Sequence, residues 1–236
     1  MNGCDGKSEI RNPKSEIRFR PSGYATTFEY HPPMALTKIG ILISGGGSNM
    51  KSIVAACEAG EVPAEVAVVI SNRADAPGLV WATEHGLATA LLPHSEFSDR
   101  EAHDRAVVER LREAEVEWVC LAGYMRLLSA LFVDAFRDRI LNIHPALLPS
   151  FPGLHGQGQA WAYGVKIAGC TVHFVDQELD HGPIVVQCPV PVLSNDDEDS
   201  LARRILEQEH IAYPEALRLL LCEPWRVEGR RVVVMG

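Results

Sequence analysis

An asparagine and a histidine stand two positions apart in the segment LNIHPALLPSFPG, which covers residues 141–153. The apolar run at residues 139–143 is typical of a buried strand, so Asn142 and His144 should project from one side of its end. Pro145 favours extended backbone at His144. An asparagine amide donates to carbonyl oxygens, and an imidazole titrates near neutral pH. A lone histidine is more often packed beside a strand, but this pair at a strand end favours chemistry on a carbonyl group.

Carboxylates follow in a later loop, VDQELDHGP, at residues 175–183. Asp176, Glu178 or Asp180 could orient the ring of His144. Taken alone, the loop is more typical of a solvated acidic turn, so its role depends on the pair upstream. No HExxH or comparable ligand spacing occurs, and no metal is expected.

A glycine-rich run, SGGGSN at residues 44–49, follows the first strongly apolar run. Glycines let the backbone approach a ligand, and the N–H groups that open the next helix favour an anion. Met50 stands where the dinucleotide fingerprint has its third glycine, and the GK[ST] of a Walker A loop is missing. We expect a phosphate site here; the alternative is a plain turn in which Ser48 caps the helix.

The segment AGYMRLLS, residues 122–129, follows another apolar run. Its aromatic and apolar residues on either side of Arg126 would suit a pocket for a flat ligand. Core packing followed by the start of a helix explains the same residues equally well.

The elements that must position these groups alternate along the chain from Lys38 onward. Expected strands are residues 38–44, 65–71, 88–92, 118–123 and 139–143, and expected helices are residues 48–59, 77–86, 98–114 and 197–222. Continuous apolar strands between helices predict an α/β fold with a single doubly wound, mostly parallel sheet covered by helices on both faces. Ser98 and Glu101 form an expected capping box.

Two later runs, residues 169–175 and 184–190, predict an antiparallel strand pair near the C-terminal part, at the sheet edge. Residues 230–235 are expected to form a final strand. The acidic residues 196–199 favour the start of the long closing helix through its dipole.

Composition sets the class of protein. The 236 residues are 47% hydrophobic and 22% charged, which is ordinary for a globular domain, and the formal charge of −9 argues against nucleic acid or anionic membranes as partners. No apolar run approaches the roughly 18 residues of a membrane span. Six cysteines without CxxC spacing predict free thiols in a reducing cytoplasm. Monomer and homodimer are equally admissible.

Residues 1–33 differ from the rest of the chain. KSEIR occurs at residues 7–11 and again at 14–18, and the stretch that follows is rich in proline and glycine. Few residues there could join a core, so disorder is expected. We therefore divide the chain into a disordered leader, residues 1–37, and a catalytic domain, residues 38–236, and we expect Met34 to be the native start. A native flexible arm is the alternative.

The motifs ILISGGGSN, LAGYMRLLS, LNIHPALLPSFPGLH, CTVHFVDQELDHGP and EQEHIAYPEAL occur in this order. From about Lys38 to Leu221, the chain resembles the folate-dependent phosphoribosylglycinamide formyltransferase family of purine biosynthesis. The resemblance implies transfer of the formyl group of 10-formyltetrahydrofolate to the amine of glycinamide ribonucleotide, which yields formylglycinamide ribonucleotide and tetrahydrofolate.

The resemblance also implies a role for each matching residue. Asn142 and His144 would polarise the formyl oxygen, His144 would donate a proton, and Asp180 would pair with His144 and relay protons through water. His173 would be a supporting residue rather than a catalyst. The phosphate would bind at Gly47, Ser48 and Asn49, and the ribose at Glu209. The folate pocket would be lined by Arg100, Met125, Arg126, Leu127, Leu128, Asn142, Asp176, Gln177, Glu178, Leu179 and Asp180.

One departure and three rival functions remain. The run at residues 156–159, GQGQ, lacks the basic residue that the family often has there, and a more mobile loop is expected. A formyltetrahydrofolate deformylase would typically have a further N-terminal domain, and a methionyl-tRNA formyltransferase a C-terminal barrel. A non-enzymatic ligand-binding module would need the glycine loop, but not Asn142, His144 and Asp180 together.

Overall fold

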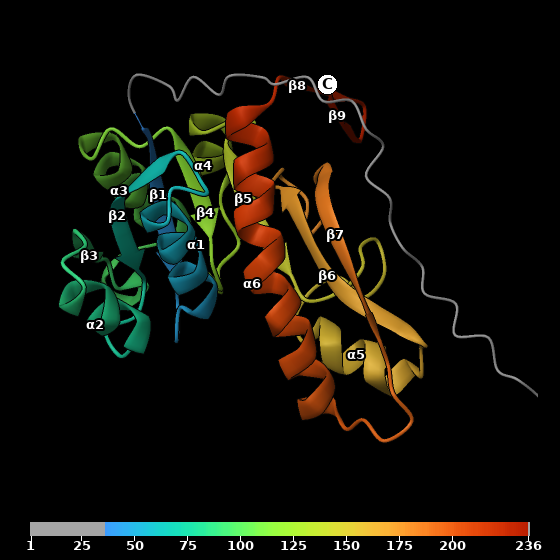
Figure 1. Cartoon of the computed structure of the whole chain (residues 1–236). Helices are drawn as coiled ribbons and strands as arrows, with labels where there is room; N and C mark the ends of the chain where they lie inside the picture. The colour runs from blue at the N-terminus through green and yellow to red at the C-terminus, as the bar shows by residue number, and fades with distance from the viewer. Residues whose placement is uncertain (1–35, 236) are drawn as a thin grey trace, which may run out of the picture. The chain divides into compact units, whose positions relative to one another are not determined.

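Nine strands form one sheet in the computed structural model, which describes residues 36–235 (Figure 1). The described residues belong to a single compact unit. The strands are β1 (Thr37–Ile43), β2 (Ala64–Ser71), β3 (Thr89–Leu91), β4 (Trp118–Leu121), β5 (Ile140–His144), β6 (Ile167–Phe174), β7 (Ile184–Pro191), β8 (Trp225–Glu228) and β9 (Arg231–Val234). The helices are α1 (Ser48–Glu58), α2 (Pro77–Glu84), α3 (Arg100–Glu113), α4 (Ala130–Ala135), α5 (Gly156–Tyr163) and α6 (Glu198–Cys222), with a 3-10 turn at His94–Glu96.

The strand order is β3-β2-β1-β4-β5-β6-β7-β9-β8. The first five strands in this order run parallel, and β6 lies antiparallel to both β5 and β7. This confirms the predicted α/β fold, a mostly parallel sheet with an antiparallel strand pair. The chain adds β2 and β3 on one side of β1 and then β4 and β5 on the other side. The carboxyl ends of β1 and β4 therefore flank a topological switch point, where ligands bind in open α/β sheets.

Helices cover both faces of the sheet, and successive side chains of a strand point to opposite faces, so one strand can contribute to two cores. On β1, Ile39, Ile41 and Ile43 join the core that contains α1 and α6, while Leu42 joins the core that contains α3 and α4. Figure 1 shows α6 along one face of the sheet with α1 beside it. None of the described helices is long and apolar enough to cross a bilayer.

Several local predictions need correction. The β6–β7 pair is not at the sheet edge, because the β8–β9 hairpin extends the sheet beyond β7. Ser98 and Glu101 do not form a capping box: α3 begins at Arg100, and the carboxylate of Asp99 accepts from the N–H of Ala102 at 2.8 Å. Asp99 has the extended backbone that an N-cap needs, and its charged oxygen is well suited to accept from an amide.

The helix that closes the fold was predicted within one residue. Asp197 is its N-cap, and a capping box joins Asp197 to Ser200. The expected loop at residues 156–159 is the first turn of α5. The first strand of the predicted catalytic domain, β1, begins at Thr37. The KSEIR repeat, the expected disorder and the expected start at Met34 lie outside the described residues. The five cysteines in the described part are all free, with Cys222 exposed.

Candidate active site

His144 is the last residue of β5, and its side chain is 4% exposed. Its Nε2 lies 2.8 Å from the carbonyl oxygen of Phe151, and its Nδ1 lies 3.4 Å from Oδ2 of Asp180. Both ring nitrogens therefore face oxygen acceptors, an arrangement that an imidazolium with two N–H groups satisfies fully. In either protonation state the ring donates an N–H to at least one of these two oxygens.

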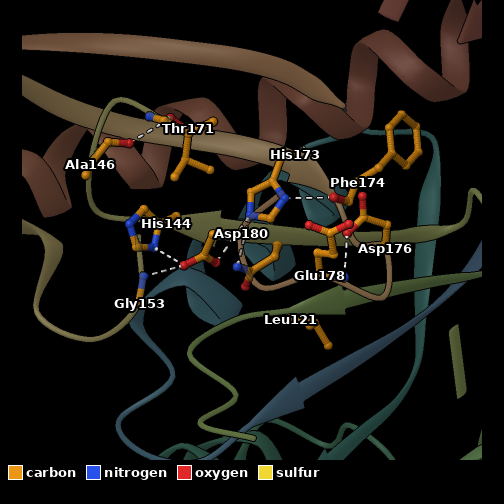
Figure 2. Close-up of polar contacts among 12 residues, drawn as sticks. Leu121, His144, Ala146, Gly153, Thr171, His173, Phe174, Asp176, Glu178 and Asp180 are labelled. Atoms are coloured by element: carbon orange, nitrogen blue, oxygen red, sulfur yellow. Dashed lines mark hydrogen bonds and ion pairs between the residues drawn. The ribbon is translucent and has the colours of Figure 1, made fainter. Parts of the chain in front are cut away.

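Asp180 lies in the loop between β6 and β7, and its side chain is 7% exposed. Figure 2 shows it between His144 and His173. Its Oδ2 also accepts from the N–H of Gly153 at 2.7 Å, which leaves Oδ1 3.8 Å from Nε2 of His173. The backbone of Asp180 is left-handed, with φ of 50°, a conformation that Asp and Asn tolerate better than other side chains.

The loop is folded back by a contact that only glycine allows. A Cβ on Gly182 would stand 1.9 Å from the carbonyl oxygen of Phe174, so the chain can return to β7 only without a side chain here. The N–H of Phe174 donates to the carbonyl of Pro183 at 2.9 Å and closes the loop base. Glu178 N–H donates to Oδ1 of Asp176 at 2.9 Å, which tightens the turn. These constraints bring the Asp180 carboxylate back to β5.

Asn142 faces His173 across the antiparallel β5–β6 ladder. Asn142 Nδ2 lies 3.2 Å from Nε2 of His173, whose Nδ1 lies 2.7 Å from the carbonyl oxygen of Phe174. Burial lowers the pKa of His173, although the Phe174 carbonyl and Asp180 act in the opposite direction. The neutral ring donates from Nδ1 and accepts at Nε2, so it fixes one amide hydrogen of Asn142 and leaves the other free to donate.

The glycine-rich run lies at the carboxyl end of β1 and opens α1. Gly47 is the N-cap, with φ of 66°, and no side chain caps the helix. Gly78 at the start of α2 packs against the run, where its N–H donates to the carbonyl of Gly45 at 3.0 Å and a Cβ would stand 2.9 Å from the same oxygen. The two glycine backbones are thus in contact. The N–H groups at the start of a helix are the kind of donor that an anion site uses, so the phosphate site stays a prediction.

Asn49, in the first turn of α1, contacts Glu209 of α6 in a buried pair. Its Nδ2 donates to Oε2 of Glu209 at 2.7 Å, and each residue is 7% exposed. Burial raises the pKa of Glu209, and the Asn49 amide offsets part of this effect. Asn49 Oδ1 is buried without a partner in the described part of the chain. The pair thus holds hydrogen-bonding capacity beside the glycine run.

Residues 37–217 match the sequence model of the formyl transferase family. This chain belongs to the formyl transferase family. The phosphoribosylglycinamide formyltransferase of Escherichia coli (strain K12) is 44% identical over 190 residues, which cover 80% of this chain and 87% of that protein. The trifunctional purine biosynthetic protein adenosine-3 of Drosophila melanogaster is 47% identical over 186 residues, but the match spans only 14% of that protein.

A solved structure gives the same result. Glycinamide ribonucleotide transformylase 1 from Symbiobacterium toebii superposes with a TM-score of 0.83 at 50% identity, covering 85% of this chain and 95% of that one. The family resemblance noted from the motifs is confirmed. The chain is therefore a formyl-transferring enzyme, and its family uses a folate co-substrate.

The segment of this formyl transferase after β4 presents apolar side chains to solvent. Met125 and Leu127 are 66% and 56% exposed, and Leu179 of the Asp180 loop is 56% exposed. Arg126 has a buried Nε without a partner among residues 36–235. Leu128 instead packs partly against the core beneath. Core packing thus accounts for Leu128, while the pocket for a flat ligand stays a prediction for its exposed neighbours.

The predicted site residues fall into groups. The structure brings Asn142, His144 and Asp180 together, and it pairs Asn49 with Glu209. Asp176 and Glu178 surround His181, whose Nδ1 lies 2.8 Å from Asp176. The remaining predicted ligands are exposed or partly exposed: Arg100, Met125, Arg126, Leu127, Gln177 and Leu179. Within residues 36–235 no cluster of three or more metal-ligating side chains forms.

Three contributors to the site were not predicted from the sequence. The carbonyl of Phe151 and the N–H of Gly153 act through backbone atoms, which carry no signature of their own. Gly156 lies where a Cβ would stand 3.0 Å from Nε2 of His144. The glycine content of the segment was the one available signal for this close approach.

Proposed function

We propose that this enzyme transfers the formyl group of 10-formyltetrahydrofolate to the amine of glycinamide ribonucleotide, the step of purine biosynthesis that yields formylglycinamide ribonucleotide and tetrahydrofolate. The observation that carries the proposal is the cluster of Asn142, His144 and Asp180 at the end of β5, in which His144 and Asp180 are buried. It lies in a sheet whose glycine run suits a phosphate. The similarity to the enzymes of E. coli and S. toebii supports the choice of acceptor.

The acceptor amine attacks the formyl carbon, and the carbonyl oxygen gains negative charge. Asn142 donates to this oxygen with the amide hydrogen that His173 does not use, and His144 exchanges one of its two carbonyl or carboxylate contacts for the oxyanion. Asp180 stabilises His144 in its protonated form and receives the amine proton through water. The oxyanion then re-forms the carbonyl as the bond between the formyl carbon and the folate nitrogen breaks. That nitrogen takes up the proton that Asp180 received, which releases tetrahydrofolate.

Two binding surfaces serve this step. Gly47, Ser48 and Asn49 would take the acceptor phosphate at the start of α1, with Glu209 on its ribose. The fit of the folate to the other surface rests on the exposed Met125, Leu127 and Leu179, and on the unpartnered Nε of Arg126. Arg100, Leu128, Asp176, Gln177 and Glu178 complete the proposed folate pocket.

The cytoplasm is the proposed compartment. The five described cysteines are unpaired, as is typical of proteins in a reducing environment. Small molecules are the proposed partners, and the acidic net charge disfavours nucleic acid.

The deciding assay measures tetrahydrofolate release from 10-formyltetrahydrofolate with and without glycinamide ribonucleotide. The proposal expects release that depends on the ribonucleotide. Equal release without the ribonucleotide would identify a deformylase instead, and no release under either condition would remove the catalytic assignment.

A further inference from the structure

The segment Ala122–Ser129 is irregular, yet it carries the proposed folate-facing side chains. It holds its shape through bonds to the end of β1. Ala122 N–H donates to Leu42 O at 2.9 Å, and the carbonyl of Gly123 accepts from the N–H of Ser44 at 3.1 Å. These bonds continue the β1–β4 ladder past the last residues of both strands, so the shape of the segment depends on where β1 ends.

The hydroxyl of Ser44 extends this connection. Ser44 Oγ donates to Oδ1 of Asn72 at 2.6 Å and accepts from the N–H of Met125 at 2.8 Å. A hydroxyl has one hydrogen, and the Met125 amide supplies the other, so the direction of both bonds is fixed. Ser44 is 7% and Asn72 3% exposed. Water therefore cannot easily replace either bond, and an unmet buried amide is costly.

Ser44 also precedes the glycine run directly. Its side chain is pinned by Asn72, beyond the end of β2, and the next residue, Gly45, is held by the N–H of Gly78. The buried hydroxyl of Ser44 thus lies between the proposed phosphate loop, which follows Ser44 directly, and the proposed folate segment after β4.

We propose that Ser44 is a positioning residue that sets both substrate-binding segments of the formyl transferase at once. The inference rests on the proposed function, because it assigns the two segments to the two substrates. Ser44 touches neither substrate; it acts through Met125 on one side and Gly45 on the other.

Asp104 provides a matched comparison at the far end of the same segment. Its Oδ2 accepts from the N–H of Ser129 at 2.6 Å, and its side chain is fully buried. Burial raises the pKa of Asp104, but the neighbouring His103 ring and the hydrogen bond from the Ser129 N–H outweigh burial, and the pKa falls below its ordinary value. Asp104 thus anchors the folate segment as a carboxylate, without a bond to the glycine run among the described contacts.

Steady-state kinetics with both substrates varied tests the inference. Ser44→Ala should raise KM for 10-formyltetrahydrofolate and KM for the ribonucleotide, each by about tenfold for the loss of one buried hydroxyl, with kcat within about threefold of wild type. Asp104→Ala removes the acceptor of the Ser129 N–H and should raise only the folate KM. Ser44→Thr keeps a hydroxyl, so both KM values should stay near those of the wild type.

Tyr213→Phe is the control for a general loss of stability. It removes a fully buried hydroxyl that bonds Leu121 O and Leu141 O, at 3.2 and 2.9 Å, and it should leave both KM values unchanged. An active wild type whose Ser44→Ala variant keeps both KM values, or raises only one, would overturn the inference. An inactive wild type would instead overturn the proposed function, so the two failures are distinct.

Discussion

Asp180→Asn isolates the charge of one carboxylate from its geometry. Asn tolerates the left-handed backbone at this position, and its side-chain oxygen can still accept from the N–H of Gly153. The change therefore removes the negative charge 3.4 Å from Nδ1 of His144 and little else. At this distance and an effective dielectric constant near 20, the attraction to an imidazolium is about 5 kcal/mol.

The magnitude follows from the transition state. If the ring charge of His144 is held by Asp180 while the oxyanion forms, loss of this attraction should lower kcat on the order of 10³-fold, since each 1.4 kcal/mol is about a factor of ten. KM values should change little, because Asp180 acts on the ring more than on the bound substrates.

The assay is the rate of ribonucleotide-dependent tetrahydrofolate release at saturating concentrations of both substrates. Circular dichroism and thermal unfolding establish that the variant is folded. Asp134→Asn is the control, because Asp134 is an exposed carboxylate on α4 that pairs with Arg137, away from the candidate active site. A folded Asp180→Asn variant with more than a tenth of the wild-type kcat would refute the electrostatic role of this residue.

Three further substitutions probe the surrounding groups. Gly156→Ala should lower kcat roughly tenfold by displacing the His144 ring, as seen by kinetics with unchanged KM values; an unaltered kcat would contradict the close contact. Burial raises the pKa of Glu209 in the folded protein, so protonated Glu209 stabilises the fold fully below about pH 4.3. This stabilisation is lost as the pH rises through the raised pKa. Glu209→Gln should therefore increase Tm at pH 7, and it should raise the KM for the ribonucleotide. Burial lowers the pKa of His173 in the folded protein, so neutral His173 stabilises the fold fully above about pH 6.5, and this stabilisation is lost as the pH falls toward the lowered pKa. His173→Gln should therefore flatten the fall in unfolding free energy below about pH 6.5. Urea titrations at several pH values measure this dependence, and an unchanged dependence on pH would argue against the assignment.

The parallel half of the fold was accessible from sequence because its strands are buried on both faces. Runs such as residues 39–43 and 118–122 are continuously apolar, and they alternate with helical patterns, so strand type and layer arrangement follow directly. The β8 strand, by contrast, is short and half exposed at the sheet edge, and it leaves little apolar pattern. The helix α5, with the sequence GQGQAWAY, has two glycines in its first turn, which disfavour a helix until tertiary contacts stabilise it.

The site divides in the same way. Asn142 and His144 were recognisable because their spacing places them on one strand end. The contact of Asp180 with His144 depends on the antiparallel β5–β6 pairing and on a left-handed residue, both set by long-range packing. The role of Ser44 had no local signal either, since its partners Asn72 and Met125 are 28 and 81 residues away.

The most direct test of the central claim follows the formyl carbon itself. The enzyme is incubated with 10-formyltetrahydrofolate carrying an isotopic label in the formyl group and with glycinamide ribonucleotide, and the products are separated and weighed by mass spectrometry. The account predicts one labelled formyl group on the ribonucleotide for every tetrahydrofolate released. Label recovered as free formate, with the ribonucleotide unmodified, would contradict it.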